Sequence, residues 1–168
     1  MNGAALELEQ LYRSEGPHVW GYLRRRLRHR DTADELLQET FLIAARSFNS
    51  LAVAGSKRGW LIGIARNLFR EHLRKKARLV AMPLIEDPAT AEVEAEDTRL
   101  HALRNAISQL PEMHREILEL RLRDDLSYAD IGVTLAIPIG TVRSRLHHAV
   151  RLVREQMGMG TADNAASA

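Results

Sequence analysis

The segment that most constrains this chain is LSYADIGVTLAIPIGTVRSRL, residues 126–146. It contains two short helical patterns separated by a turn. Ser127 stands three residues before Asp130, which is the spacing of a capping box at the start of a helix. Pro138 suits the beginning of a second helix, where its missing N–H group is not needed. The segment therefore predicts a helix-turn-helix.

The two helices differ in what they are expected to bury and to expose. The first should bury Ala129, Ile131 or Val133, and Leu135. In the second, apolar residues recur at helical spacing and should face the core, namely Val142, Leu146, Ala149 and Val153. This leaves a polar and basic outer face made of Arg143, Ser144, Arg145, His147 and His148. Such a helix fits a DNA major groove, although an ordinary pair of helices with a solvated basic face gives the same pattern.

The composition predicts an all-α fold. Leu, Ala, Arg and Glu are abundant, and no segment alternates with the period of two that is typical of a strand. The chain of 168 residues has no cysteine, which excludes a disulfide framework and a thiolate metal site. We find no signal-peptide pattern and no apolar run long enough to span a membrane, so we expect a cytoplasmic protein.

The charges are unevenly distributed along the chain. Residues 1–79 contain 15 Lys and Arg against 8 Asp and Glu, whereas residues 80–98 contain 6 acidic residues and no basic one. Charge blocks of opposite sign usually mark separate modules. We therefore expect two small helical domains, 1–79 and 98–157, joined by an acidic flexible linker, 80–97, and followed by a disordered tail, 158–168.

Two features of the first domain stand out. The Gly16-Pro17 pair should interrupt or restart the first helix. Further along, a basic run at residues 70–78 lies close to Trp60, Asn67 and Phe69. Basic side chains neutralise phosphates, aromatic rings stack on unpaired bases, and an Asn amide can bond the edge of a displaced base. The run therefore indicates a single-strand nucleic-acid surface, although Trp60 also fits an apolar stripe and is favoured as a core residue.

One helix of this basic domain has an acidic face, made of Asp34, Glu35, Gln38 and Glu39. An acidic face is often no more than solvated surface. Acidic groups beside a DNA surface would repel DNA, so a protein partner is a reasonable interpretation.

Enzyme signatures are missing from the sequence. The seven histidines form no HExxH pattern, and there is no glycine-rich phosphate loop and no nucleophile elbow. We therefore predict that the chain is not an enzyme and that it uses no metal and no cofactor.

Four stretches resemble successive conserved blocks of sigma-70-type factors: ADELLQETFLIAARSF, WLIGIARNLFREHLRKKAR, LPEMHREILELR and LSYADIGVTLAIPIGTVRSRLHHA. Their order and spacing resemble the extracytoplasmic-function (ECF) group, which keeps only two globular domains. The resemblance covers residues 6–155. It implies a dissociable promoter-specificity subunit of bacterial RNA polymerase, which performs no catalysis itself.

The resemblance also implies partners and sites. The first site is a polymerase set, Asp34, Glu35, Gln38 and Glu39, for the clamp helices of the largest polymerase subunit, with the flap as a further contact. The second is a −10 set within residues 57–78, for recognising and melting promoter DNA: Trp60, Arg66, Asn67, Phe69, Arg70, Arg74 and Lys75. Asn67 would start the loop that captures a flipped-out base. The third is a −35 set for duplex DNA: Ser127, Tyr128, Thr141, Arg143, Ser144, Arg145, His147 and His148.

The family resemblance further implies an anti-sigma partner, frequently one anchored in the membrane, without direct membrane insertion of this chain. Two departures concern the melting segment, where Lys57 replaces a frequent aromatic residue and Ile62-Gly63 replaces a common Tyr-Arg pair. Two other functions remain open. A stand-alone helix-turn-helix regulator would need a dimer to read two half-sites, and a sigma-like decoy for an anti-sigma factor would not need Asn67 or the basic clusters.

Overall fold

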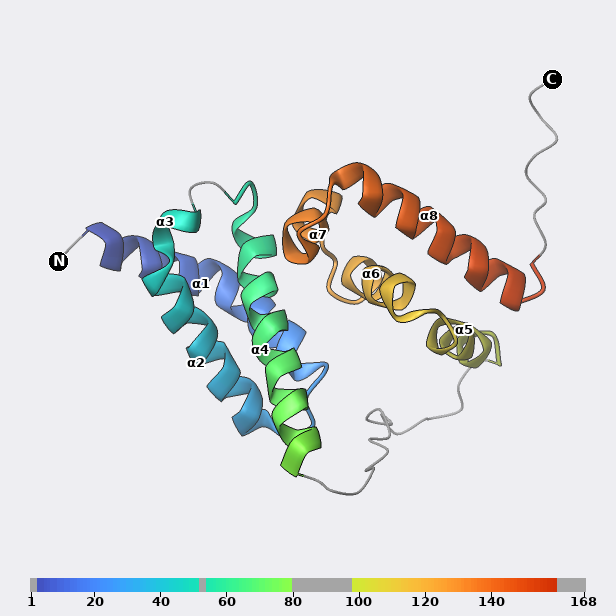
Figure 1. The fold of residues 1–168 in the computed structure, drawn as a ribbon, viewed down its shortest axis with the longest axis horizontal. Helices are drawn as coiled ribbons and strands as arrows, with labels where there is room; N and C mark the ends of the chain where they lie inside the picture. The colour runs from blue at the N-terminus through green and yellow to red at the C-terminus, as the bar shows by residue number, and fades with distance from the viewer. Residues whose placement is uncertain (1–2, 52–53, 80–97, 160–168) are drawn as a thin grey trace.

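The computed structural model describes residues 3–51, 54–79 and 98–159 (Figure 1). These residues form helices and no strand, so the predicted all-α fold is confirmed. The first group of helices is α1 (Gly3–Arg24), α2 (Arg30–Arg46), α3 (Phe48–Leu51) and α4 (Lys57–Leu79). The second group is α5 (Thr98–Ser108), α6 (Glu112–Leu122), α7 (Tyr128–Leu135) and α8 (Ile139–Gln156). The predicted linker, 80–97, and residues 160–168 of the predicted tail lie outside the described residues.

The first group is a bundle in which α1, α2 and α4 pack on one another. Each helix contributes apolar residues at helical spacing to one core. Among the buried residues are Val19, Tyr22 and Leu23 of α1, Ala33, Leu37, Phe41 and Ala44 of α2, and Leu61, Ile62, Ala65 and Leu68 of α4. This core fixes the direction in which the remaining, polar faces of α2 and α4 point.

Helix α1 continues through Pro17, so the expected interruption at Gly16-Pro17 is wrong. Proline removes one backbone hydrogen bond from a helix interior, which is a real cost. Here Leu11 on one side of Pro17 and Val19 and Leu23 on the other are buried in the same core. Packing on both sides holds the helix together across the proline.

The second group contains the predicted helix-turn-helix, α7 followed by α8. Ser127 and Asp130 form the predicted capping box, with the Asp130 N–H donating to Ser127 Oγ at 3.1 Å and the Ser127 N–H donating to Asp130 Oδ2 at 2.9 Å. Ala136 adopts a left-handed conformation that ends α7, and Pro138 precedes the first turn of α8. All four predicted core residues of α8 are buried.

Helix α7 buries a different set of residues from the one expected. Ile131 and Thr134 are buried, whereas Ala129 is exposed and Leu135 is half-buried. The reason is that α7 packs against α4 of the first group as well as against α8. Thr134 faces α4, and its hydroxyl donates a hydrogen bond to the Gly59 carbonyl oxygen at 3.0 Å.

The contact between α4 and α7 joins the two groups of helices (Figure 1). Gly59 of α4 lies directly against the backbone of Asp130, where an added Cβ would sit 2.5 Å from the Asp130 carbonyl oxygen. Only glycine allows this approach. One turn later, a Cβ at Gly63 would lie 3.5 Å from the Thr134 carbonyl oxygen, which is ordinary contact.

Candidate nucleic-acid interface

All seven residues of the −10 set lie on α4, but they do not share one surface. Trp60 and Phe69 are half-buried and pack against the core, which agrees with the core position favoured for Trp60. Asn67, Arg74 and Lys75 are exposed. Their backbone positions are fixed by the buried face of the same helix.

Asn67 lies in the interior of α4, so the expectation that it starts a loop is wrong. Its neighbour Leu68 is buried in the core, and good helix formers continue the helix as far as Leu79. The Asn67 side chain makes no hydrogen bond to another described residue, so its exposed amide keeps all of its donors and acceptors.

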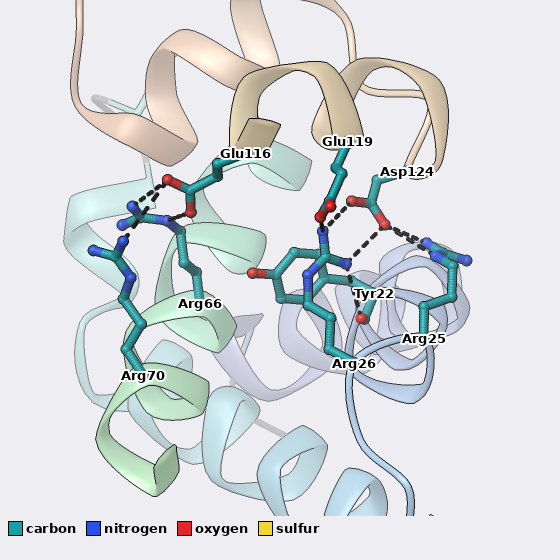
Figure 2. Close-up of polar contacts among 8 residues, drawn as sticks. All are labelled: Tyr22, Arg25, Arg26, Arg66, Arg70, Glu116, Glu119 and Asp124. Atoms are coloured by element: carbon teal, nitrogen blue, oxygen red, sulfur yellow. Dashed lines mark hydrogen bonds and ion pairs between the residues drawn. The ribbon is translucent and has the colours of Figure 1, made fainter. Parts of the chain in front are cut away.

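Arg66 and Arg70 of the −10 set point toward α6 of the second group (Figure 2). Arg66 donates two hydrogen bonds to Glu116, at 2.5 Å from Nε and 2.8 Å from Nη2. Arg70 donates to Glu112 at 3.0 Å and lies 3.8 Å from Glu116. Burial raises the pKa of the Glu116 carboxyl, but the hydrogen bonds and charge of Arg66 lower it by more, so the pKa falls below its usual value. Glu116 is therefore ionised at neutral pH.

A second group of ion pairs lies at the end of α1, beside the first (Figure 2). Arg25 donates to Asp124 at 2.6 Å and Arg26 donates to it at 2.8 Å. The Asp124 side chain is only 1% exposed, so its carboxylate is buried against these two arginines. The Arg26 guanidinium stacks 3.9 Å from the ring centre of Tyr22, and burial raises the pKa of Tyr22 to about 12.

The −35 set lies on α8 and at the start of α7. Its exposed members are Ser127, Tyr128, Arg143, Ser144 and His147, and its half-buried members are Thr141, Arg145 and His148. The Ser127 hydroxyl is engaged in the capping box. The His148 ring lies 4.8 Å from that of His114 on α6, so it is less available than its neighbours.

The polymerase set divides in two. Glu35, Gln38 and Glu39 are exposed along α2. Asp34 is half-buried and accepts a hydrogen bond at 2.8 Å from the indole nitrogen of Trp20 on α1. Arg30 lies 3.8 Å from the same carboxylate. Asp34 therefore has a structural partner that the sequence pattern did not indicate.

A pocket lies where the two groups of helices meet, and it brings the −10 and −35 sets together. It is lined by Arg66, Arg70, Glu112, Met113, Glu116, Leu135 and Arg145. Sequence reasoning missed the acidic residues of this site, because Glu112 and Glu116 look like an ordinary charged helix face. It also missed Gly59, although the four-residue spacing from Gly59 to Gly63 was a readable sign of close helix packing.

Within the described residues, no group of side chains is arranged to hold a metal ion. None of the described helices is long and apolar enough to cross a membrane.

Comparisons with known proteins identify the family. The model of sigma-70 region 2 matches residues 11–79, and the model of sigma-70 region 4 matches residues 100–153. The chain is 34% identical over 161 residues to the RNA polymerase sigma factor CarQ of Myxococcus xanthus, covering 94% of this chain and 92% of that protein. It is 33% identical over 168 residues to the ECF RNA polymerase sigma factor SigE of Mycolicibacterium smegmatis, covering 95% of this chain and 65% of that protein.

The chain belongs to the sigma-70 family, in its ECF group. The family consists of transcription initiation factors, so the prediction that this sigma factor is not an enzyme is confirmed. Among solved structures, the sigma factor RpoE in a co-crystal with the anti-sigma factor NepR from Bartonella quintana has the same fold. Its TM-score is 0.64 at 24% identity, covering 92% of this chain and 98% of that one.

The Trp20–Asp34 hydrogen bond yields a testable prediction about stability. Asp34→Ala should lower the free energy of unfolding by about 1–3 kcal/mol, because it leaves a half-buried indole N–H without its partner. Asp34→Asn keeps an acceptor oxygen and should cost less. Glu35→Ala, on the exposed neighbour, is the control and should change stability by less than about 0.5 kcal/mol. Urea denaturation followed by tryptophan fluorescence measures all three, and equal effects for Asp34→Ala and Glu35→Ala would contradict the structural role.

Proposed function

We propose that this ECF sigma factor directs core RNA polymerase to promoters by reading the −35 element as duplex and contacting the −10 element as its strands separate. The observation that carries the proposal is that one side of α8 is buried and apolar while the other side is exposed and polar. Four buried apolar residues hold one side of α8 on the core, and the side chains of Arg143, Ser144 and His147 are exposed on the other. A helix held in this way can enter a major groove without disturbing its own domain.

On the −35 element, Arg143 is the strongest candidate for base recognition. Its guanidinium is exposed in the N-terminal half of α8, the part of a recognition helix that reaches base edges. Arginine bonds guanine through two parallel hydrogen bonds in the major groove. Ser144 and His147 supply further polar contacts from the same side of the helix.

On the −10 element, Asn67 is the candidate for holding a base that has left the stack. Its amide both donates and accepts hydrogen bonds, and it is exposed between Trp60 and the exposed Arg74 and Lys75. The basic side chains would hold the adjoining backbone. Opening needs no chemical step, because stacking of about 1–3 kcal/mol per captured base offsets the loss of pairing.

Contact with core polymerase would use the exposed acidic face of α2. This face fits the clamp helices of the largest subunit, with the flap as a second contact for the other domain. An anti-sigma factor is a further expected partner, since the related fold of RpoE was solved with one. The working location of such a factor is the cytoplasm, where the polymerase is.

The test is run-off transcription from a randomised promoter library with core polymerase alone and with core polymerase plus this chain. The proposal expects discrete transcripts only when the chain is present, and their upstream sequences define its promoter. A stand-alone regulator would bind DNA without core polymerase and give no such transcripts. A decoy would bind neither DNA nor core polymerase, so either result would overturn the proposal.

The polymerase set gives the first functional prediction. Glu35→Lys with Glu39→Lys should weaken binding to core polymerase at least tenfold while leaving the melting temperature unchanged, because both side chains are exposed. The same two reversals at Glu7 and Glu155, which are also exposed, give the same net charge and should leave affinity unaltered. Fluorescence anisotropy of the labelled chain with core polymerase measures both. Equal affinities for the two variants would rule out this docking face.

Arg143 gives the second functional prediction. Arg143→Ala should cost about 1–3 kcal/mol of promoter binding and relax the preference at one −35 position. Arg154→Ala removes the same charge from an exposed position in the last turn of α8 and should weaken binding equally on all sequences or not at all. Selection from the randomised library with each variant shows the preferences. If Arg143→Ala selects the parental −35 sequence with parental affinity, α8 docks in another way.

Asn67 gives the third functional prediction. Asn67→Ala should leave duplex binding through α8 nearly intact and reduce open-complex formation, measured by permanganate footprinting of the −10 region. A template with a pre-melted bubble should recover part of the activity, because its bases are already unpaired. Since Asn67 is exposed inside α4, alanine should not lower the melting temperature. Parental rates of opening on linear duplex would exclude base capture by this residue.

A further inference from the structure

A pair of histidine rings lies between α6 and the helix proposed to read the −35 element. His114 is in the first turn of α6, and His148 lies on α8 next to the buried Ala149. The centres of the two rings are 4.8 Å apart, and the ring planes are inclined at 45°. Both residues are half-buried. The function proposed above assigns no task to His114 and no specific contact to His148.

The His148 ring is uncharged in this geometry. One terminal nitrogen of the Arg151 guanidinium lies 2.8 Å from His148 Nδ1. Arginine has N–H donors and no acceptor, so Nδ1 must accept this bond and the ring proton must lie on Nε2. The Arg151 Nε atom also lies 3.6 Å from Glu155. Arg151 is therefore held in one place on α8, with His148 on one side and Glu155 on the other.

The His114 ring is also best accommodated without charge. Its Nδ1 atom is buried and has no hydrogen-bond partner among the described residues. A charged imidazole carries N–H donors at both nitrogens, and a buried donor without an acceptor is costly. The ring also lies in the first turn of a helix, where the helix dipole disfavours positive charge. Burial lowers the pKa of His114, and His148 and Arg145 lower it further.

The groups around the two rings do not compensate a positive charge. Arg145 and Arg151 lie three residues before and three residues after His148, on the same side of α8. The carboxylates on the helices packed against α8 have other partners: Glu112, Glu116, Glu119 and Asp130. The remaining titratable groups on these helices are basic or phenolic: Arg99, His101, Arg104, Arg115, Arg121 and Tyr128.

We infer that His114 is a positioning residue for the −35 helix: its uncharged ring holds His148, and through His148 it holds Arg151, so that protonation of the ring pair loosens α8 from α6. The inference rests on the proposed function, since it concerns how α8 is held while Arg143 reaches a base. Reading a base edge requires side chains to be placed within roughly 0.5 Å. A loosened α8 would still bind phosphates but would distinguish bases less well.

Thermodynamic linkage gives the direction of the pH dependence. The packed ring pair binds fewer protons than the separated rings, because packing lowers the pKa of His114. The contact is therefore strongest above the ordinary histidine pKa of about 6.5, and it weakens as the pH falls below that value. Acid has the opposite effect on general DNA affinity, because added positive charge attracts phosphates of any sequence.

The test therefore measures selectivity rather than affinity. Selectivity is the affinity of the holoenzyme for a duplex with the selected −35 sequence, divided by its affinity for the same duplex with that element scrambled. General effects of pH on core polymerase and on phosphate binding cancel in this ratio. Between about pH 7.5 and about pH 5.5, the range over which histidine changes charge, the selectivity of the unsubstituted chain should fall about fivefold or more. An unchanged selectivity would overturn the inference.

A double variant removes both titrating rings while keeping their contacts. His114→Phe keeps a flat ring where Nδ1 has no partner, and His148→Asn keeps an acceptor oxygen for Arg151. The double variant should show the same selectivity at both pH values to within about twofold. His147→Asn makes the same change on the exposed neighbouring histidine and should lose selectivity in acid as the unsubstituted chain does. A merely structural role would lower the melting temperature of the double variant and leave its acid loss in place, which would also overturn the inference.

A second measurement needs neither promoter nor polymerase. In an NMR titration of the histidine ring protons of the whole chain, His114 should titrate below the ordinary histidine pKa, and His148→Asn should raise its midpoint because one neighbour that becomes a cation is gone. A His114 midpoint that His148→Asn leaves unchanged would show that the rings do not act on each other and would overturn the inference. Failure of the proposed function is distinguishable, because the unsubstituted chain would then select no −35 sequence even at neutral pH.

Discussion

Where α4 meets α7, the two backbones come so close that no side chain fits between them at Gly59. The other contacts between the domains depend on this approach. It brings the Gly59 carbonyl within reach of Thr134, and it lies on the same stripe of α4 as Arg66, which reaches Glu116. A side chain at position 59 would move the helices apart and lengthen these bonds together. The geometry is thus set by the absence of a side chain, and the charged groups act within it.

Local features of the fold could be predicted from the sequence. The capping box of Ser127 and Asp130 and the buried side of α8 depend on residues three or four positions apart, which a single pattern displays. The grouping of the −10 set within residues 57–78 followed from the family resemblance. The contact of α4 with α7 did not, because it joins Gly59 and Ser56 to residues more than seventy positions away. A local repeat of apolar residues cannot indicate a contact between residues so far apart in the sequence.

The other wrong predictions concern residues whose burial or hydrogen bonding depends on a partner that is distant in the sequence. Thr134 is buried because α4 offers it a carbonyl oxygen, and a polar residue can be buried where it finds a hydrogen-bond partner. Asp34 looked like one member of an exposed acidic face, but its carboxylate accepts a hydrogen bond from the indole N–H of Trp20 on α1. Pro17 looked like a break, but the core on both sides of it keeps α1 continuous. In each case the local preference was real and tertiary contact outweighed it.

The charged end of the contact depends on matched partners. Arg66 and Arg70 of α4 donate to Glu116 and Glu112 of α6. Arg25 and Arg26 donate to Asp124, whose side chain is only 1% exposed. A buried carboxylate without a partner would be strongly destabilising, because it would lose its hydration and gain nothing in return. These ion pairs therefore stabilise the contact only in the geometry that the close approach at Gly59 allows.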